Sequence, residues 1–130
     1  AGELKAVAGI GAEKLGYFPP CHLREQDIGR PWAELLAAVP GVRMEGIGRP
    51  DDCCGLGGIM GFKTNFHHAS LAMGRGLMAR TEAVGPDRVV TECLGCRVQF
   101  EQMQERPVSH PVELLAQAYR DAEAAEAASR

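Results

Sequence analysis

The residues of this sequence with the most distinctive chemistry are its five cysteines, which fall into three groups: Cys21, the adjacent pair Cys53–Cys54, and Cys93 with Cys96. An odd number of cysteines does not suit a simple framework of disulfide bonds. Thiolate sulfur is a soft ligand that selects zinc or iron–sulfur clusters over hard cations such as magnesium. The cysteines therefore predict either a sulfur-ligated metal centre or a thiol redox site.

The number of cysteines bears on which metal they would bind. A structural zinc ion is satisfied by four ligands, and a cubane [4Fe–4S] cluster by four cysteines. Five cysteines exceed both sets, so either one of them is a bystander or the centre is an unusual cluster that takes more than four thiolates. Cys93 and Cys96 alone also have the spacing of a redox pair. Three hypotheses follow: an iron–sulfur cluster, a structural zinc ion, and a metal-free thiol–disulfide switch.

A bent backbone is needed if both members of the Cys53–Cys54 pair are to serve one centre, because adjacent side chains tend to point apart. Gly55, Gly57 and Gly58 follow the pair and supply that conformational freedom. Such a loop also presents amide N–H groups, which can hydrogen-bond sulfur and tune a reduction potential. Gly55 is therefore a candidate neighbour of the centre.

Two histidines are further candidate neighbours of the sulfurs. His22 follows Cys21 directly, where it could donate to a sulfur, replace a ligand or cap the start of a helix. His110 precedes Pro111, which favours an extended backbone at the histidine. From the end of the last predicted strand His110 could approach the metal centre, although capping a helix or packing is an alternative role. No Ser-His-Asp set, paired-carboxylate pattern or phosphate-binding glycine motif accompanies the cysteines.

Strands that alternate with helices are expected to position these residues. Strands are predicted over residues 14–18, 42–45, 88–91 and 107–109, and helices from Pro31, over 65–83, after Cys93 and from Pro111. This alternation predicts an α/β fold, with a small, mainly parallel four-stranded sheet and flanking helices. Cysteines follow three of the four strands, and ligands bind at the carboxyl ends of parallel strands. The cysteines are therefore expected on loops at that edge of the sheet.

Length and composition indicate one soluble globular domain, with 130 residues, 45% hydrophobic and 24% charged. We expect an N-terminal extension or linker over 1–13, the cysteine-rich domain over 14–120 and a helical tail over 121–130. The aromatic side chains of Trp32, Phe62 and Phe66 are assigned to the core.

Charge and targeting signals limit the partners and the compartment. The net charge is −3, from 14 basic and 17 acidic residues, which gives no electrostatic reason to expect nucleic acid or an anionic membrane surface as a partner. No apolar run approaches the ~20 residues of a membrane span, and no signal peptide is recognised, so a cytoplasmic location is expected. The missing initial methionine fits an excised domain.

The cysteine pattern, one cysteine followed by CCG and then CxxC, resembles that of the cysteine-rich CCG domain family. Four blocks carry the resemblance and span residues 17 to about 119: Tyr17–Leu23, Cys53–Gly58 with Gly61-Phe62-Lys63, Thr91–Cys96 with Gln99, and His110–Leu115. The gap of 38 residues before Cys93 is slightly longer than is usual in this family. The family includes the B subunit of heterodisulfide reductase and the iron–sulfur subunit of glycolate oxidase. Residues 61–63 and 110–119 most resemble the C-terminal CCG domain in the C subunits of anaerobic glycerol-3-phosphate dehydrogenases.

This resemblance implies that Cys21, Cys53, Cys54, Cys93 and Cys96 ligate a non-cubane [4Fe–4S] cluster, although some relatives hold Zn²⁺ through four of the five. It implies electron transfer from a dehydrogenase or flavoprotein subunit toward a quinone or a disulfide. A second CCG copy is expected elsewhere in a larger subunit, and partner subunits could bring the domain to the inner face of the cell membrane. We expect no catalytic activity from the domain alone.

Overall fold

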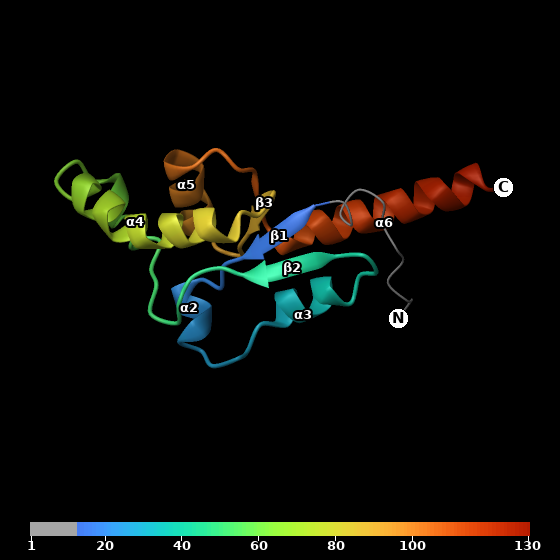
Figure 1. The fold of residues 1–130 in the computed structure, drawn as a ribbon, viewed down its shortest axis with the longest axis horizontal. Helices are drawn as coiled ribbons and strands as arrows, with labels where there is room; N and C mark the ends of the chain where they lie inside the picture. Colours follow the sequence, from blue (N-terminus) through green and yellow to red (C-terminus); the bar gives the residue numbers. More distant parts are fainter. Residues whose placement is uncertain (1–12) are drawn as a thin grey trace.

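A four-stranded parallel sheet organises the part of the chain that the computed structural model describes, residues 13–130 (Figure 1). The strands lie in the order β2-β1-β3-β4, and every neighbouring pair is parallel. Their bounds are β1 Lys14–Tyr17, β2 Arg43–Gly46, β3 Arg88–Val90 and β4 Val108–Ser109. All four strands were expected from the sequence to within a residue or two at each end. The prediction of a small α/β fold is confirmed.

Helices connect the strands, as the right-handed crossover of parallel strands requires. Two short elements were not predicted. One is α2, which follows the prolines Pro19 and Pro20 at the end of β1, and the other is the 3₁₀ turn η1 in the glycine-rich loop. Neither is long enough to show a periodic apolar pattern. The helical elements are α2 Cys21–Arg24, α3 Pro31–Ala37, η1 Met60–Phe62, α4 His67–Val84, α5 Leu94–Met103 and α6 Pro111–Ala128.

The helices cover both faces of the sheet and create two separate apolar cores. On one face, α3 and α6 pack against the side chains that β1 and β3 direct toward them, and on the other face lie α4 and α5. The first core contains Leu15, Tyr17, Leu36, Val39, Val90, Leu114 and Ala118. The second contains Phe18, Ile47, Cys54, Leu56, Leu77, Val89, Cys96, Phe100 and Val108. Two of the five cysteines are thus part of the second core.

The buried face of α4 differs from the one that its large apolar residues suggested. Ser70, Gly74, Leu77 and Thr81 face inward. Phe66 is 42% exposed and Phe62, in the preceding turn, is 63% exposed. The assignment of these two aromatic side chains to the core is therefore wrong. Neither residue lies on the inward-facing side of α4, because Phe62 belongs to the η1 turn and Phe66 precedes the first turn of the helix.

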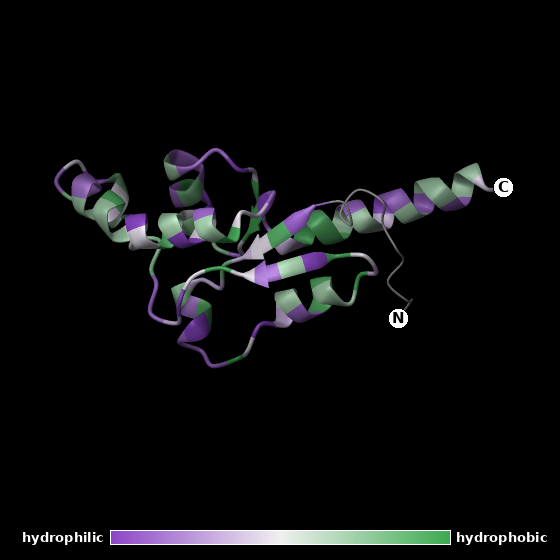
Figure 2. Cartoon of the chain, in the orientation of Figure 1, coloured by the Kyte–Doolittle hydropathy of each residue, from purple (hydrophilic) through white to green (hydrophobic). Residues whose placement is uncertain are grey.

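The last helix continues past the predicted end of the domain. α6 is one helix from Pro111 to Ala128, and Ala122 on it is still buried, so no break marks residue 120. Its C-terminal part projects beyond the sheet (Figure 1), and apolar and polar segments are interleaved along its length (Figure 2). The predicted N-terminal extension, 1–13, lies outside the described residues except for Glu13. None of the helices formed by residues 13–130 combines the length and apolar character that crossing a lipid bilayer requires.

Candidate metal centre

All five cysteines lie around one cavity of about 580 Å³ at the carboxyl edge of the sheet. The loops that carry them follow β1, β2 and β3, which are neighbours in the sheet, so residues far apart in sequence meet there. The five side chains are free of disulfide bonds. His22 and a set of glycines and apolar side chains complete the lining: Leu56, Gly57, Gly58, Ile59, Phe62, Leu94, Gly95 and Val98.

Cys21 is the first residue of α2 and is exposed to solvent. The chain leaves β1 through Phe18 and two prolines, all buried, which direct it over the edge of the sheet. α2 spans only four residues, and none of its residues is buried. Cys21 therefore stands on a surface element rather than on the core.

Gly55 makes the bend that lets the adjacent cysteines face one cavity. Its φ angle is +92°, in the region that favours glycine, and its N–H donates to the Cys53 sulfur at 3.3 Å. A Cβ atom at this position would lie 2.2 Å from the backbone oxygen of Ser70. From the other side, a Cβ on Gly74 would lie 2.6 Å from the Cys54 carbonyl oxygen. The loop and α4 thus meet backbone to backbone, and both glycines are required for that contact.

An ion pair holds the same loop from its other side. The Asp52 carboxylate, next to Cys53 in sequence, accepts two hydrogen bonds from the Arg80 guanidinium on α4 and one from the Arg49 N–H at 2.7 Å. The Arg80 contact holds the pKa of this carboxyl below its usual range although burial opposes the shift. The Asp52–Arg80 ion pair therefore holds the loop that carries Cys53 against α4.

Cys93 and Cys96 lie at the start of α5. Cys93 is the N-cap residue, and its sulfur accepts a hydrogen bond from the Cys96 N–H at 3.4 Å. Cys96 is in the first turn and is only 3% exposed. Gln99, one turn further, is fully buried and donates to the Ser70 carbonyl of α4 at 3.1 Å, which ties α5 to the helix under the Cys53–Cys54 loop.

The cysteine side chains also influence one another. The Cys96 thiol donates to the Cys54 sulfur, and this hydrogen bond lowers the pKa of Cys54 to about 6 while raising the pKa of Cys96. Burial raises the pKa of Cys53, which senses Cys54 and Cys21 as neighbouring charges. A lowered pKa favours the thiolate form, which is the form that binds metal. The contact between Cys54 and Cys96 therefore favours the thiolate form at Cys54.

A polar contact lies beside the cavity where β1 and β3 end. The Tyr17 hydroxyl donates to the Glu92 carboxylate, and burial and then Glu92 raise the pKa of Tyr17. The second oxygen of Glu92 and the Thr91 hydroxyl are buried without a partner among the described residues. These residues precede Cys93 directly, so they connect the ends of two strands immediately before a cysteine.

The two candidate histidines lie in different surroundings. His22 lines the cysteine cavity. His110 is not among the residues that line it. Its Nδ1 atom accepts the Val112 N–H at 3.0 Å at the start of α6, and its ring packs edge-on against Trp32, with ring centres 5.4 Å apart. The contacts of His110 therefore support its capping role rather than a contact with sulfur.

An exposed apolar rim around the cysteines was not predicted. Leu94 between Cys93 and Cys96 is 75% exposed, and Ile59 and Phe62 are similarly open. The signal for it in the sequence is weak: large apolar residues within a loop rich in glycine, with no helical or strand period to place them in a core. The rim makes the mouth of the cavity apolar.

The donor set fits a sulfur-ligated cluster. The sulfur atoms around the cavity all belong to cysteines, and backbone N–H groups already donate to the sulfurs of Cys53 and Cys93, as is typical of iron–sulfur sites. Within residues 13–130, no three His, Cys, Asp or Glu side chains are grouped as ligands of a single metal ion. The five sulfurs surround a cavity instead of one point.

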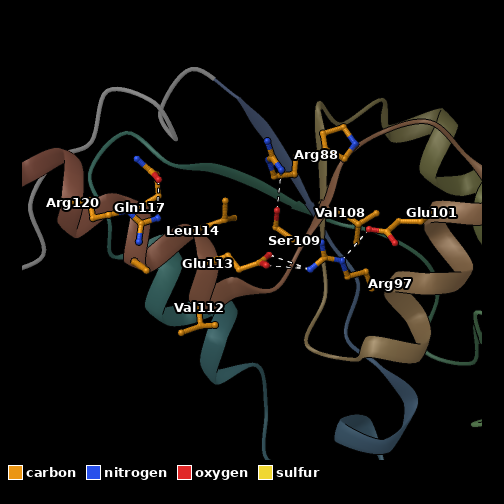
Figure 3. Close-up of a pocket in the computed structure, with 12 residues that line it drawn as sticks. Arg88, Arg97, Glu101, Val108, Ser109, Val112, Glu113, Leu114, Gln117 and Arg120 are labelled. Carbon is orange, nitrogen blue, oxygen red and sulfur yellow. Dashed lines mark hydrogen bonds and ion pairs between the residues drawn. The ribbon is translucent and has the colours of Figure 1, made fainter.

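A second and larger hollow, about 780 Å³, lies away from the cysteines, between α5, α6 and β4 (Figure 3). Arg97 crosses it from α5 and pairs with Glu101 and with Glu113 on α6. Arg88 reaches into it and donates to the Ser109 hydroxyl at 2.9 Å. The pair that Arg97 makes with Glu113 joins α5 to α6 across this hollow.

Comparison with known proteins identifies a family to which the chain belongs. The chain matches the cysteine-rich domain family CCG over residues 15–101, which begins within β1 and ends within α5. The chain belongs to the CCG cysteine-rich domain family. All five cysteines lie within the matched residues, so the cavity described above is formed by the part of the chain that defines the family.

Relatives of this CCG domain are subunits of oxidoreductases. The chain is 36% identical over 105 residues to the C subunit of anaerobic glycerol-3-phosphate dehydrogenase from Escherichia coli (strain K12), covering 81% of this chain and 26% of that protein. It is 27% identical over 115 residues to the B subunit of fumarate reductase (CoM/CoB) from Methanothermobacter marburgensis, covering 83% of this chain and 23% of that protein. The chain thus spans about a quarter of the length of these relatives.

Proposed function

We propose that this chain is an electron-transfer domain that holds a non-cubane [4Fe–4S] cluster through Cys21, Cys53, Cys54, Cys93 and Cys96. The observation that carries the proposal is that three neighbouring strands bring all five cysteines to one cavity. A cluster bound there would accept and release single electrons. The protein supplies the thiolates, the N–H donors of Gly55 and Cys96, and an apolar surrounding, which together set the reduction potential.

The number of sulfurs supports a cluster over a zinc ion. One tetrahedral zinc would leave one of the five cysteines without a metal bond. Each cysteine lines the same cavity, including exposed Cys21 and buried Cys96. A centre with several metal atoms can use ligands that are spread around a cavity, whereas a single ion needs them grouped around one point.

The names of the relatives support a role in a larger oxidoreductase. We propose that a dehydrogenase or flavoprotein subunit donates the electrons, and that a quinone or a disulfide accepts them. A second CCG copy in the same polypeptide is part of this proposal, since the relatives are about four times as long as the matched region. The proposed location is the cytoplasm, at the inner face of the cell membrane where partner subunits attach it.

His22 and Gly55 belong to the proposed site as neighbours of the ligands. His22 lines the cavity, and Gly55 both bends the loop and donates to a ligand sulfur. His110 is left out, because its ring nitrogen caps α6.

Anaerobic reconstitution of the 130-residue chain with iron and sulfide tests the proposal. About four iron and four sulfide per chain, with an EPR signal in one redox state, is the expected result. Substituting any one of the five cysteines with serine lowers the iron content, whereas His110→Gln, outside the cavity, retains it. One zinc per chain without sulfide would establish the structural zinc alternative. A metal-free chain in which only Cys93 and Cys96 oxidise reversibly would establish the thiol switch.

A further inference from the structure

Arg24 is the side chain that ties the first cysteine to the loop of the second and third. It lies on α2 three residues after Cys21, and no residue of that helix is buried. The guanidinium donates to the Arg49 carbonyl at 3.0 Å and to the Asp52 carbonyl. Its Cζ atom also lies 5.6 Å from the centre of the Phe18 ring. Asp52 directly precedes Cys53, so Arg24 links two ligand-bearing segments beyond the ends of the paired strands β1 and β2.

The charge of Arg24 differs from that of the other arginine at this loop. Arg80 is paired with the Asp52 carboxylate. Arg24 bonds only to neutral carbonyl oxygens, and within residues 13–130 no carboxylate lies within ion-pair distance of it. Its guanidinium is hydrogen-bonded to the carbonyl oxygen of Asp52, the residue that directly precedes Cys53. Arg24 therefore places beside the cysteine loop a positive charge that no carboxylate of residues 13–130 neutralises.

We propose that Arg24 is a positioning residue of the metal centre, which holds Cys21 beside Cys53 and raises the reduction potential of the bound cluster. The inference rests on the proposed function. Each one-electron reduction adds a negative charge to a thiolate-ligated cluster, and a nearby fixed cation stabilises that added charge. The electron comes from the dehydrogenase partner in the complex and from dithionite in the experiment below.

Two substitutions separate the two effects. Arg24→Gln removes the charge, and Arg24→Lys keeps the charge but loses the planar fork that reaches two carbonyls. Arg120→Gln is the matched control, since it removes the same charge from α6, where Arg120 bonds to Gln117. Each chain is reconstituted with iron and sulfide. Its midpoint potential is then measured by an EPR-monitored titration, and the rate of cluster loss to a chelator is followed in parallel.

The expected result is a split between the variants. Arg24→Gln disfavours the reduced form by about tenfold, which is about 59 mV for a one-electron couple, while Arg24→Lys stays near the wild-type potential. Both variants lose the cluster about tenfold faster, because Cys21 is no longer held. Arg120→Gln changes neither quantity.

Each other outcome has a definite meaning. A wild-type potential in Arg24→Gln, or an equal shift in Arg120→Gln, overturns the role of the charge. A wild-type rate of cluster loss in Arg24→Lys overturns the positioning role, and this test remains available if Arg24→Gln takes up no iron. A wild-type chain that assembles no cluster contradicts the proposed function itself, and with it the tuning of a potential.

Discussion

Cys54 and Cys96 differ from Cys21 in burial and in the contacts that position them. Cys54 and Cys96 are 6% and 3% exposed and belong to the apolar core between the sheet, α4 and α5. Cys21 is exposed on α2, a four-residue helix with no buried residue. Packing therefore positions the sulfurs of Cys54 and Cys96, whereas polar contacts from Arg24 position that of Cys21.

The difference shows that this site is half core and half surface. Its core half is built from the backbone contact of Gly55 with α4 and from the small inward-facing residues of that helix. Its surface half adds no residue to either core, because no residue of α2 is buried. Changes in the core half are thus expected to affect stability and metal binding together, and changes in the surface half to affect metal binding alone.

The largest effect is expected at Gly55. Substitution with alanine forces an L side chain to adopt φ +92° and places its Cβ 2.2 Å from the Ser70 oxygen. The expected loss is about 3 kcal/mol of the free energy of unfolding, from backbone strain and steric overlap together. Denaturant unfolding of the metal-free chain measures it. A near-neutral Gly55→Ala would show that the loop does not rest on α4 and would remove the distinction between the two halves.

A matched pair of glycines on α4 tests the same contact from the helix side. Gly74→Ala brings a Cβ to 2.6 Å from the Cys54 carbonyl oxygen and is expected to cost about 2 kcal/mol. At Gly76 the nearest atom to the added Cβ belongs to the Arg80 guanidinium, at 3.1 Å, a side-chain end rather than backbone. Gly76→Ala is therefore expected to change the free energy of unfolding by less than about 0.5 kcal/mol, because the gain in helix propensity offsets a small shift of a guanidinium that is paired with Asp52. Thermal unfolding of both variants checks the contrast, and equal effects would contradict it.

Cysteine-to-serine substitutions compare the two halves directly. Cys54→Ser places a hydroxyl in the second core and is expected to lower the stability of the metal-free chain by about 1–2 kcal/mol. Cys21→Ser changes an exposed position and is expected to stay within about 0.5 kcal/mol. Both should lose iron after reconstitution. Unfolding under reducing conditions and iron analysis give the two numbers, and equal stability losses would argue against a surface-held Cys21.

The loop that follows β4, at the same edge of the sheet, tests whether the site extends beyond the three cysteine-bearing loops. After β4, the Glu113 carboxylate accepts the His110 N–H at 2.9 Å, which holds the pKa of Glu113 below its usual range, and Arg97 adds to this effect. A depressed carboxyl pKa contributes stability that is present above the unfolded pKa, about 4.3, and lost as pH falls through the lower folded value.

Glu113→Gln is therefore expected to cost about 0.5 kcal/mol at neutral pH and less at pH 3, with iron uptake unchanged. Unfolding curves at the two pH values check this. Glu101→Gln is the control, because it breaks a pair with Arg97 but leaves the helix cap intact. A loss of iron in Glu113→Gln would extend the site to the fourth loop.

Some features of the site could be predicted because they depend on local chemistry. Proline and glycine positions and short β-branched runs located the strands, and the rule that ligands bind at the carboxyl ends of parallel strands placed Cys21, Cys53 and Cys93 at one edge. The positions of Phe62 and Phe66 could not be predicted in this way. Their apolar character favoured burial, but Phe62 belongs to the η1 turn and Phe66 precedes the first turn of α4, and both are exposed.

By itself the sequence determined the parallel sheet and the edge at which the cysteines meet, because these follow from residue types and the order of elements. Only the tertiary structure decided which cysteines are core and which are surface, and that His110 caps a helix beside Trp32. It also revealed that Asp52 neutralises Arg80, whereas no carboxylate of residues 13–130 pairs with Arg24. These outcomes depend on contacts between residues distant in sequence, whose distances and burial no local pattern encodes.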